Sequence, residues 1–194
     1  MATRSIYQGT NDCPKSWGQH GVKNSILHDH QTMRPIEQIS ALIPTIWADL
    51  NSLGDDGYCI IGSSALCLSG IELPVADLDV LTSAQGAKEL MTRWSARRDY
   101  AFTPAQPERF RSTFGRFQFD IMPVEVMGGL EVNDGHAWTP VIRPETEIRL
   151  VSGLPVNIPT FKAQKRILFQ LGRPKDLAKI RWIEKVENQI NSSR

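Results

Sequence analysis

Apolar residues recur along the chain with two periods, one typical of helices and one typical of strands. From Pro35 they follow at three- and four-residue steps, which predicts a helix with one buried face; these residues are Ile36, Ile39, Ile43, Ile46 and Leu50. After the turn-rich NSLGDDG comes YCII (58–61), short and wholly apolar, which predicts a buried strand. Gly62 and Ser63 end that strand, and the following SALCLSGI predicts a short helix.

Strict alternation appears next, in DLDVL. Leu78 and Val80 fall on one face of the predicted strand and Asp77 and Asp79 on the other, so the two carboxylates point the same way. The segment 82–98 then begins with capping residues and continues with helical spacing.

A second alternating strand is predicted within GRFQFDIMPVEV (115–126). Phe117, Phe119 and Ile121 share its apolar face, and Asp120 lies on the opposite face.

The end of the chain predicts a hairpin followed by helices. EIRLVSGLPVNIP turns at Ser152-Gly153, and the next helix stops at Gly172, a residue suited to a left-handed cap. We therefore expect an α/β (α+β) fold, a small mixed β-sheet flanked by helices, in one domain over 34–194 with C-terminal helices at about 160–191. Residues 1–33 lack sustained periodicity, which predicts a flexible or loosely packed segment.

Composition restricts the function less than these patterns do. The chain has 194 residues, enough for one domain, and its 22 basic residues balance 21 acidic ones, so the overall charge does not favour a nucleic-acid or membrane binder. No apolar run is long enough for a membrane span or a signal peptide, and three cysteines without a CxxC spacing favour a reducing compartment. A cytoplasmic protein without membrane association is the expectation.

The candidate chemistry lies in three carboxylates and a glycine turn. Asp77 and Asp79 repel each other on one strand face unless a cation lies between them, and Mg²⁺, or Mn²⁺ in its place, prefers such oxygen ligands. A third carboxylate, Asp120, would complete a two-metal site. The turn Gly62-Ser63-Ser64 opens a helix whose free N–H groups suit phosphate oxygens. Metal and phosphate cradle together predict a site for a nucleoside triphosphate (NTP).

This arrangement resembles a known superfamily. IIGSSALCLSGIELPVADLDVLTS is similar to the signature of nucleotidyltransferases with a polymerase β-like fold, and FQFDIMP resembles their strand with the third carboxylate. KAQKRILFQLGRPKDLAKI is similar to the helical ending of small bacterial members, including the abortive-infection and toxin nucleotidyltransferases. The three motifs span about 58–181.

The resemblance implies roles for individual residues. Gly62, Ser63 and Ser64 would hold the triphosphate, and Asp77, Asp79 and Asp120 would bind metal and act in catalysis, with Asp120 helping to deprotonate the acceptor. Lys165, Arg173 and Lys175 would neutralise phosphate charge. One departure is Lys179, which stands where such tails often carry a second aspartate.

The acceptor stays open at this stage: a tRNA end, a protein hydroxyl or a small molecule, with an antitoxin-like protein as a further partner. Six arginines interleaved with phenylalanines between Arg93 and Arg116 could form a nucleic-acid surface if they converge on the aspartates, or an ordinary charged surface if they do not. Two other functions compete with nucleotide transfer. One is a catalytically degenerate binding or regulatory module, and the other is a glycosyltransferase with an Asp-x-Asp motif, which leaves Gly62-Ser63 and Asp120 unexplained.

Overall fold

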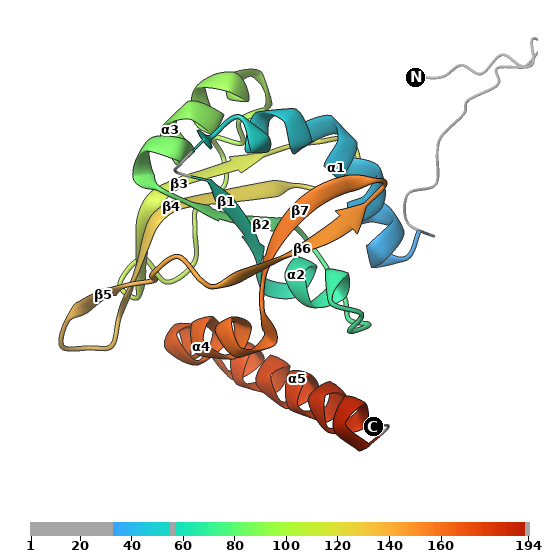
Figure 1. Ribbon diagram of the computed structural model, residues 1–194. Helices are drawn as coiled ribbons and strands as arrows, with labels where there is room; N and C mark the ends of the chain where they lie inside the picture. The colour runs from blue at the N-terminus through green and yellow to red at the C-terminus, as the bar shows by residue number, and fades with distance from the viewer. Residues whose placement is uncertain (1–32, 55–56, 193–194) are drawn as a thin grey trace, which may run out of the picture.

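A mixed sheet with the strand path β1-β2-β4-β3 organises the computed structural model, which describes residues 33–54 and 57–192 (Figure 1). β2 pairs antiparallel with β1 and parallel with β4, and β3 pairs antiparallel with β4. The strands of this sheet, including β5 at the end of β4, are β1 (Tyr58–Ile61), β2 (Leu78–Thr82), β3 (Phe110–Phe117), β4 (Val124–Asn133) and β5 (Trp138–Pro140).

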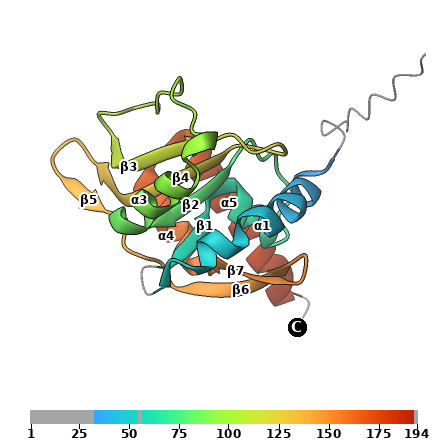
Figure 2. The same ribbon diagram turned by 90° about the horizontal axis from the view of Figure 1, so that it is seen from above.

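One face of the sheet carries the main core. Helices α1 (Pro35–Asn51) and α3 (Ala84–Arg93) cover this face in both views (Figures 1 and 2). The predicted spacing of α1 is confirmed, because Ile39, Ile43 and Ile46 are completely buried. The Ser83 hydroxyl caps α3 by accepting a hydrogen bond from the backbone N–H of Gly86 (2.9 Å).

The other face is covered by the helical ending of the chain. α2 (Gly62–Leu68) leaves the end of β1, and α4 (Phe161–Leu171) and α5 (Pro174–Ser192) lie on the side of the sheet opposite α1 and α3 (Figure 1). A second apolar cluster joins α4 to β1 and β2; it contains Cys59, Ile61, Leu81, Ile167 and Leu171. This cluster occupies only part of the face, which leaves the rest for polar groups.

The predicted hairpin is also confirmed, as β6 (Thr146–Val151) and β7 (Leu154–Pro159). Its turn residues Ser152 and Gly153 have positive φ angles of 51° and 78°. The hairpin forms a separate two-stranded sheet that packs against α1 and β1, where the indole N–H of Trp47 donates a hydrogen bond to the carbonyl of Pro155 (2.8 Å).

The prediction of a strand through Asp120 is wrong. β3 ends at Phe117, β4 begins at Val124, and residues 118–123 form the connection between them. Phe119 is nevertheless buried, because its ring packs edge-to-face on Trp94 at 5.3 Å. The apolar alternation that predicted a strand therefore comes from loop side chains anchored in the core.

The predicted apolar face of α5 is confirmed only in part. Ile183 is completely buried and Ile180 and Val186 are partly buried, whereas Leu177 and Ile190 remain exposed. α5 therefore packs through a narrow stripe of side chains around Ile183, and most of its other side chains are exposed to solvent.

The segment 1–33, predicted to be flexible or loosely packed, lies outside the described residues apart from residue 33. Among the helices within 33–54 and 57–192, none combines the length and the hydropathy needed to cross a membrane.

Phe117 is expected to be a major contributor to stability. Its side chain is completely buried and packs edge-to-face on Trp94 at 5.3 Å, so Phe117→Ala should lower the free energy of unfolding by about 3–5 kcal/mol. Phe169→Ala is the matched control, since Phe169 on α4 is 74% exposed, and should change it by no more than about 0.5 kcal/mol. Urea denaturation followed by circular dichroism measures both, and equal losses would contradict this account of the core.

Candidate active site

Acidic and basic side chains form a row across the sheet on the face opposite the main core. Asp79 on β2 is the register partner of Glu125 on β4, and Glu125 is the register partner of Arg116 on β3. Asp77 stands just before β2, two residues from Asp79, so both carboxylates share this face as predicted. Three acidic side chains from two neighbouring strands therefore lie close to one another.

The glycine turn lies directly against this row. Gly62 has φ +68°, and a Cβ at this position would collide with Oδ2 of Asp79, so the position requires glycine both for its backbone and for its space. The buried hydroxyl of Ser64 donates a hydrogen bond to the carbonyl of Asp77 (2.8 Å). The structure therefore brings the turn and both aspartates together. Ser64 is committed to the backbone, while the hydroxyl of the half-buried Ser63 has no hydrogen-bond partner among the described residues.

The environment of Asp79 disfavours its ionised form. Burial, followed by the charges of Asp77 and Glu125, raises its pKa to about 7. The positive charges of Lys179 and Arg173 oppose this shift only in part. A carboxylate with a pKa raised by burial and by like charges is a feature of functional sites.

The start of α5 supplies the opposing positive charges. Arg173 is held in place by Asp176, which is fully buried and accepts hydrogen bonds from the Arg173 guanidinium at 2.6 and 3.1 Å. The positive charge of Lys175 lowers the pKa of Glu125, and that of Lys179 lowers the pKa of Asp79, in each case against the effect of burial. Lys179, the one departure from the resemblance, is thus a member of the site, and burial lowers the pKa of its ammonium while Asp176 and Asp79 oppose this.

Lys165 belongs to a different contact. Its ammonium group donates a hydrogen bond to Oε2 of Glu187 at 2.6 Å, which joins α4 to α5. It is not among the charges that shift the pKa of Asp79. In this structure its identified role is therefore to hold the two C-terminal helices together.

Asp120 lies outside the strands, whereas Glu125, to which the sequence pattern assigned no role, lies in the carboxylate row. Asp120 is exposed in the connection between β3 and β4, whereas Glu125 lies in register with Asp79 and its pKa is raised by burial and by Asp77. The sequence did carry a signal for Glu125, because it lies between Val124 and Val126 in the same alternation that surrounds Asp79. The stronger alternation around Asp120 concealed it.

The arginines between Arg93 and Arg116 do not converge on the carboxylates. Only Arg116 reaches them, with Nη1 donating hydrogen bonds to Glu125 and to Oδ2 of Asp77 (3.4 Å). The other five contact different parts of the molecule: Arg93 contacts Asp49 and Ser52, Arg97 lies over the Phe119 ring, Arg98 bonds the Phe114 carbonyl, Arg109 bonds the Leu171 carbonyl, and Arg111 pairs with Glu131. A nucleic-acid surface at the site required all six arginines to converge on the aspartates, and they do not.

Asp77 and Asp79 are the residues that fit a divalent metal ion. Both are oxygen donors on one face, and an ion would relieve the repulsion that raises the pKa of Asp79. Within the described residues, no group of three or more His, Cys, Asp or Glu side chains is arranged to hold a metal. Two carboxylates suffice for Mg²⁺, which usually completes its coordination with water and substrate phosphates.

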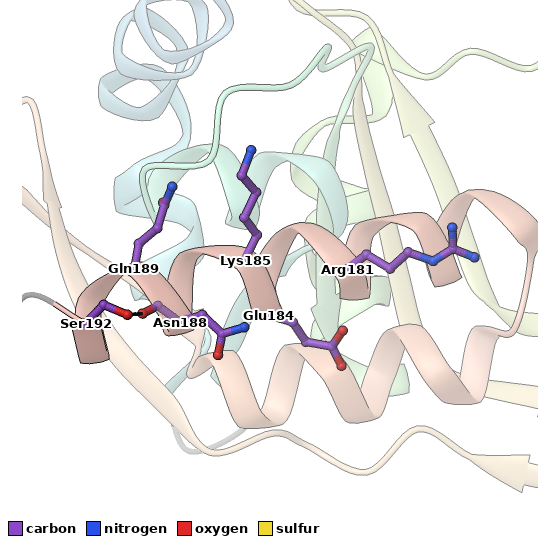
Figure 3. Close-up of a pocket in the computed structure, with 6 residues that line it drawn as sticks. All are labelled: Arg181, Glu184, Lys185, Asn188, Gln189 and Ser192. Atoms are coloured by element: carbon purple, nitrogen blue, oxygen red, sulfur yellow. Dashed lines mark hydrogen bonds between the residues drawn. The ribbon is translucent and has the colours of Figure 1, made fainter.

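A shallow, open depression of about 670 Å³ lies along the exposed side of α5 (Figure 3). Its lining is entirely polar or charged and comes from a single helix face: Arg181, Glu184, Lys185, Asn188, Gln189 and Ser192. None of the residues predicted to bind substrate or metal lines it, so we assign the candidate site to the carboxylate row.

The raised pKa of Asp79 predicts a specific dependence of stability on pH. Between the unfolded-state pKa of 3.8 and the folded-state pKa of about 7, the folded protein retains a proton that the unfolded chain releases. The stability of the wild type relative to Asp79→Asn should therefore be greatest at low pH and be lost as pH rises through about 7, by at most about 1.4 kcal/mol per pH unit. Urea denaturation of both proteins from about pH 5 to about pH 8 measures the difference, and a constant difference would contradict the raised pKa.

Comparison with known proteins gave structural matches but no match to a family model and no match to a curated protein. TM1012 from Thermotoga maritima, a provisionally assigned nucleotidyltransferase, superposes with a TM-score of 0.61 at 21% sequence identity. The match covers 81% of this chain and 99% of TM1012.

Two further matches have lower scores. The lincosamide antibiotic adenylyltransferase LnuA, solved with lincomycin, has a TM-score of 0.47 and 10% identity over 76% of this chain and 95% of LnuA. ANT(2")-Ia, solved with adenylyl-2"-tobramycin, has a TM-score of 0.47 and 16% identity over 77% of this chain and 92% of that protein. Scores below 0.5 do not establish a shared fold, so the conclusion depends on TM1012: this chain has a nucleotidyltransferase-like fold, as its sequence motifs predicted.

Proposed function

We propose that this protein is a metal-dependent nucleotidyltransferase that moves a nucleoside monophosphate from an NTP to an acceptor hydroxyl and releases pyrophosphate. The observation that carries the proposal is the close approach of Gly62 to Asp79, together with the hydrogen bond from Ser64 to Asp77. The proposal is supported by these contacts, because a glycine turn of this kind suits phosphate oxygens and the neighbouring carboxylate pair suits a divalent cation. The nucleotidyltransferase-like fold supports the same function.

The transfer forms one bond and breaks another. The acceptor oxygen bonds to the α-phosphorus while the bond from this phosphorus to the oxygen that bridges the α- and β-phosphates breaks, and pyrophosphate leaves with that oxygen. Mg²⁺ or Mn²⁺, bound to Asp77 and Asp79, would stabilise negative charge on the phosphates. Gly62 and Ser63 would orient the triphosphate, and Arg173, Lys175 and Lys179 would face its charge from α5.

We assign the third carboxylate to Glu125 in preference to Asp120. Glu125 is in register with Asp79, and its raised pKa, caused by burial and by Asp77, suits a group that accepts the proton of the acceptor hydroxyl. Asp120 is exposed in a loop. Lys165, paired with Glu187, would contribute to phosphate binding only after leaving that partner.

The acceptor belongs to one of three classes: RNA, a protein hydroxyl or a small molecule. The arginines between Arg93 and Arg116 contact different parts of the molecule, so they do not support RNA as the acceptor. An antitoxin-like partner depends on the resemblance to toxin-type members alone.

Ligand binding is tested by thermal unfolding. At 100 times the dissociation constant, Mg²⁺ with the correct NTP should stabilise the wild type by about 2.7 kcal/mol, which raises the Tm by roughly 5–10 °C for a chain of this size. Asp79→Asn should lose this increase because it removes a metal ligand, while Asp120→Asn should keep it. If neither Mg²⁺ nor any of the four common NTPs changes the wild-type Tm, the nucleotide site does not exist.

Catalysis is tested by transfer of label. The protein is incubated with each NTP labelled at the α-phosphate, Mg²⁺ and, separately, total tRNA, cell protein and a small-molecule extract. Label should move to one of these fractions and pyrophosphate should appear in equal amount, with both lost in Asp79→Asn. Binding of an NTP without transfer to any fraction would favour the degenerate binding module instead.

A further inference from the structure

Arg116 occupies an unusual place for a positive charge in a metal-dependent site. Its Nη1 donates hydrogen bonds to Glu125 and to Oδ2 of Asp77, and its Nε lies 4.0 Å from Oδ2 of Asp99. One guanidinium therefore neutralises the β3 side of the carboxylate row, where a second metal ion would have to bind.

The surroundings of Arg116 hold it there. The Phe102 ring lies 4.4 Å from the guanidinium carbon, and only 16% of the Arg116 side chain is exposed. Asp99 fixes this arrangement, because its carboxylate accepts hydrogen bonds from the backbone N–H groups of Ala101 and Phe102 and from the side chain of Gln118. Separating a partly buried charge pair leaves an uncompensated charge in each partner, which is costly.

Glu125 is correspondingly committed to Arg116. Its side chain is 15% exposed, so a metal ion that took Glu125 as a ligand would first have to break a sheltered, charge-assisted hydrogen bond. Asp79 has no such partner, since no hydrogen bond to its carboxylate exists among the described residues, and its pKa is raised by burial and then by its acidic neighbours. The less neutralised side of the row is thus the β1 side, next to Gly62.

We propose that Arg116 is the permanent cation of the β3 side of this site, so that the protein binds one divalent ion, at Asp77 and Asp79, instead of the two expected from the sequence. The inference rests on the proposed function. Arg116 is then a positioning residue that orients Glu125 and Asp77.

The charges of α5 support a single ion. The charge of Lys175 on α5 opposes that of Glu125, whereas Lys179 and Arg173 oppose the charge of Asp79 only in part and leave it able to bind one ion. A second divalent ion at Glu125 would be repelled by Arg116, which is hydrogen-bonded to that carboxylate, and by the charge of Lys175.

The experiment counts bound ions. The wild type is equilibrated with Mn²⁺ and the non-cleavable α,β-methylene analogue of whichever NTP gives the largest increase in Tm, and the ratio of Mn²⁺ to nucleotide retained with the protein is measured after ultrafiltration. The expected ratio is one for the wild type and for Arg116→Lys, which keeps the charge. In Arg116→Gln, Glu125 and Asp77 become free to bind metal, and the ratio should rise to two. Arg111→Gln, which removes another β3 arginine that pairs with Glu131, is the matched control and should stay at one.

Several results would overturn the inference. They are a wild-type ratio of two, a ratio of one in folded Arg116→Gln, or loss of nucleotide from that variant, which would mean that Arg116 holds the substrate. If the wild type retains neither Mn²⁺ nor nucleotide, the proposed function itself is wrong, so the two failures are distinguishable. If Arg116→Gln does not fold, Glu125→Gln decides: an unchanged ratio of one supports the inference, and a lower ratio makes Glu125 a metal ligand.

Discussion

Repulsion among Asp77, Asp79 and Glu125 is the constraint on which the architecture of the site depends. The register of β2 and β4 places these acidic groups together on one face of the sheet, where burial and the charges of Asp77 and Glu125 raise the pKa of Asp79. Two elements supply positive charge to this face: β3 carries Arg116, which pairs with Asp77, and α5 carries Lys179, which opposes the charge of Asp79. The fold therefore collects opposite charges from three strands and one helix on one face of the sheet.

The position of α5 is part of the same constraint. Gly172, with φ +63°, ends α4 and lets the chain reverse into α5, and the Arg109 guanidinium donates hydrogen bonds to the Leu171 carbonyl at 2.7 and 3.1 Å. Lys165 and Glu187 then join the two helices. These contacts fix the C-terminal helices relative to each other and to β3, so the basic start of α5 faces the carboxylates in a defined way.

The local patterns predicted the elements that carry their own periodicity. α1 follows from its apolar spacing, β2 from the alternation around Asp79, and the end of α4 from Gly172. The position of Glu125 beside Asp79 was not predicted, because Phe119 alternates like a strand residue although it packs on Trp94 from a loop. Arg116 and Lys179 could not be assigned, since their roles depend on which strands and helices meet across the sheet, and that is a long-range property of the fold.

The hydrogen bond from the Ser64 hydroxyl to the Asp77 carbonyl joins the two ends of the segment that connects the glycine turn to the aspartates. It pins the two ends of the segment 65–76, so the geometry of the turn and of the aspartates does not depend on the length of the chain between them. Ile71 and Leu73 anchor part of this segment in the main core, whereas Gly70 is exposed and an added Cβ there would meet open space. Insertions at Gly70 would thus cost little, and relatives of this protein are free to differ at this turn while they keep the same arrangement of Gly62, Asp77 and Asp79.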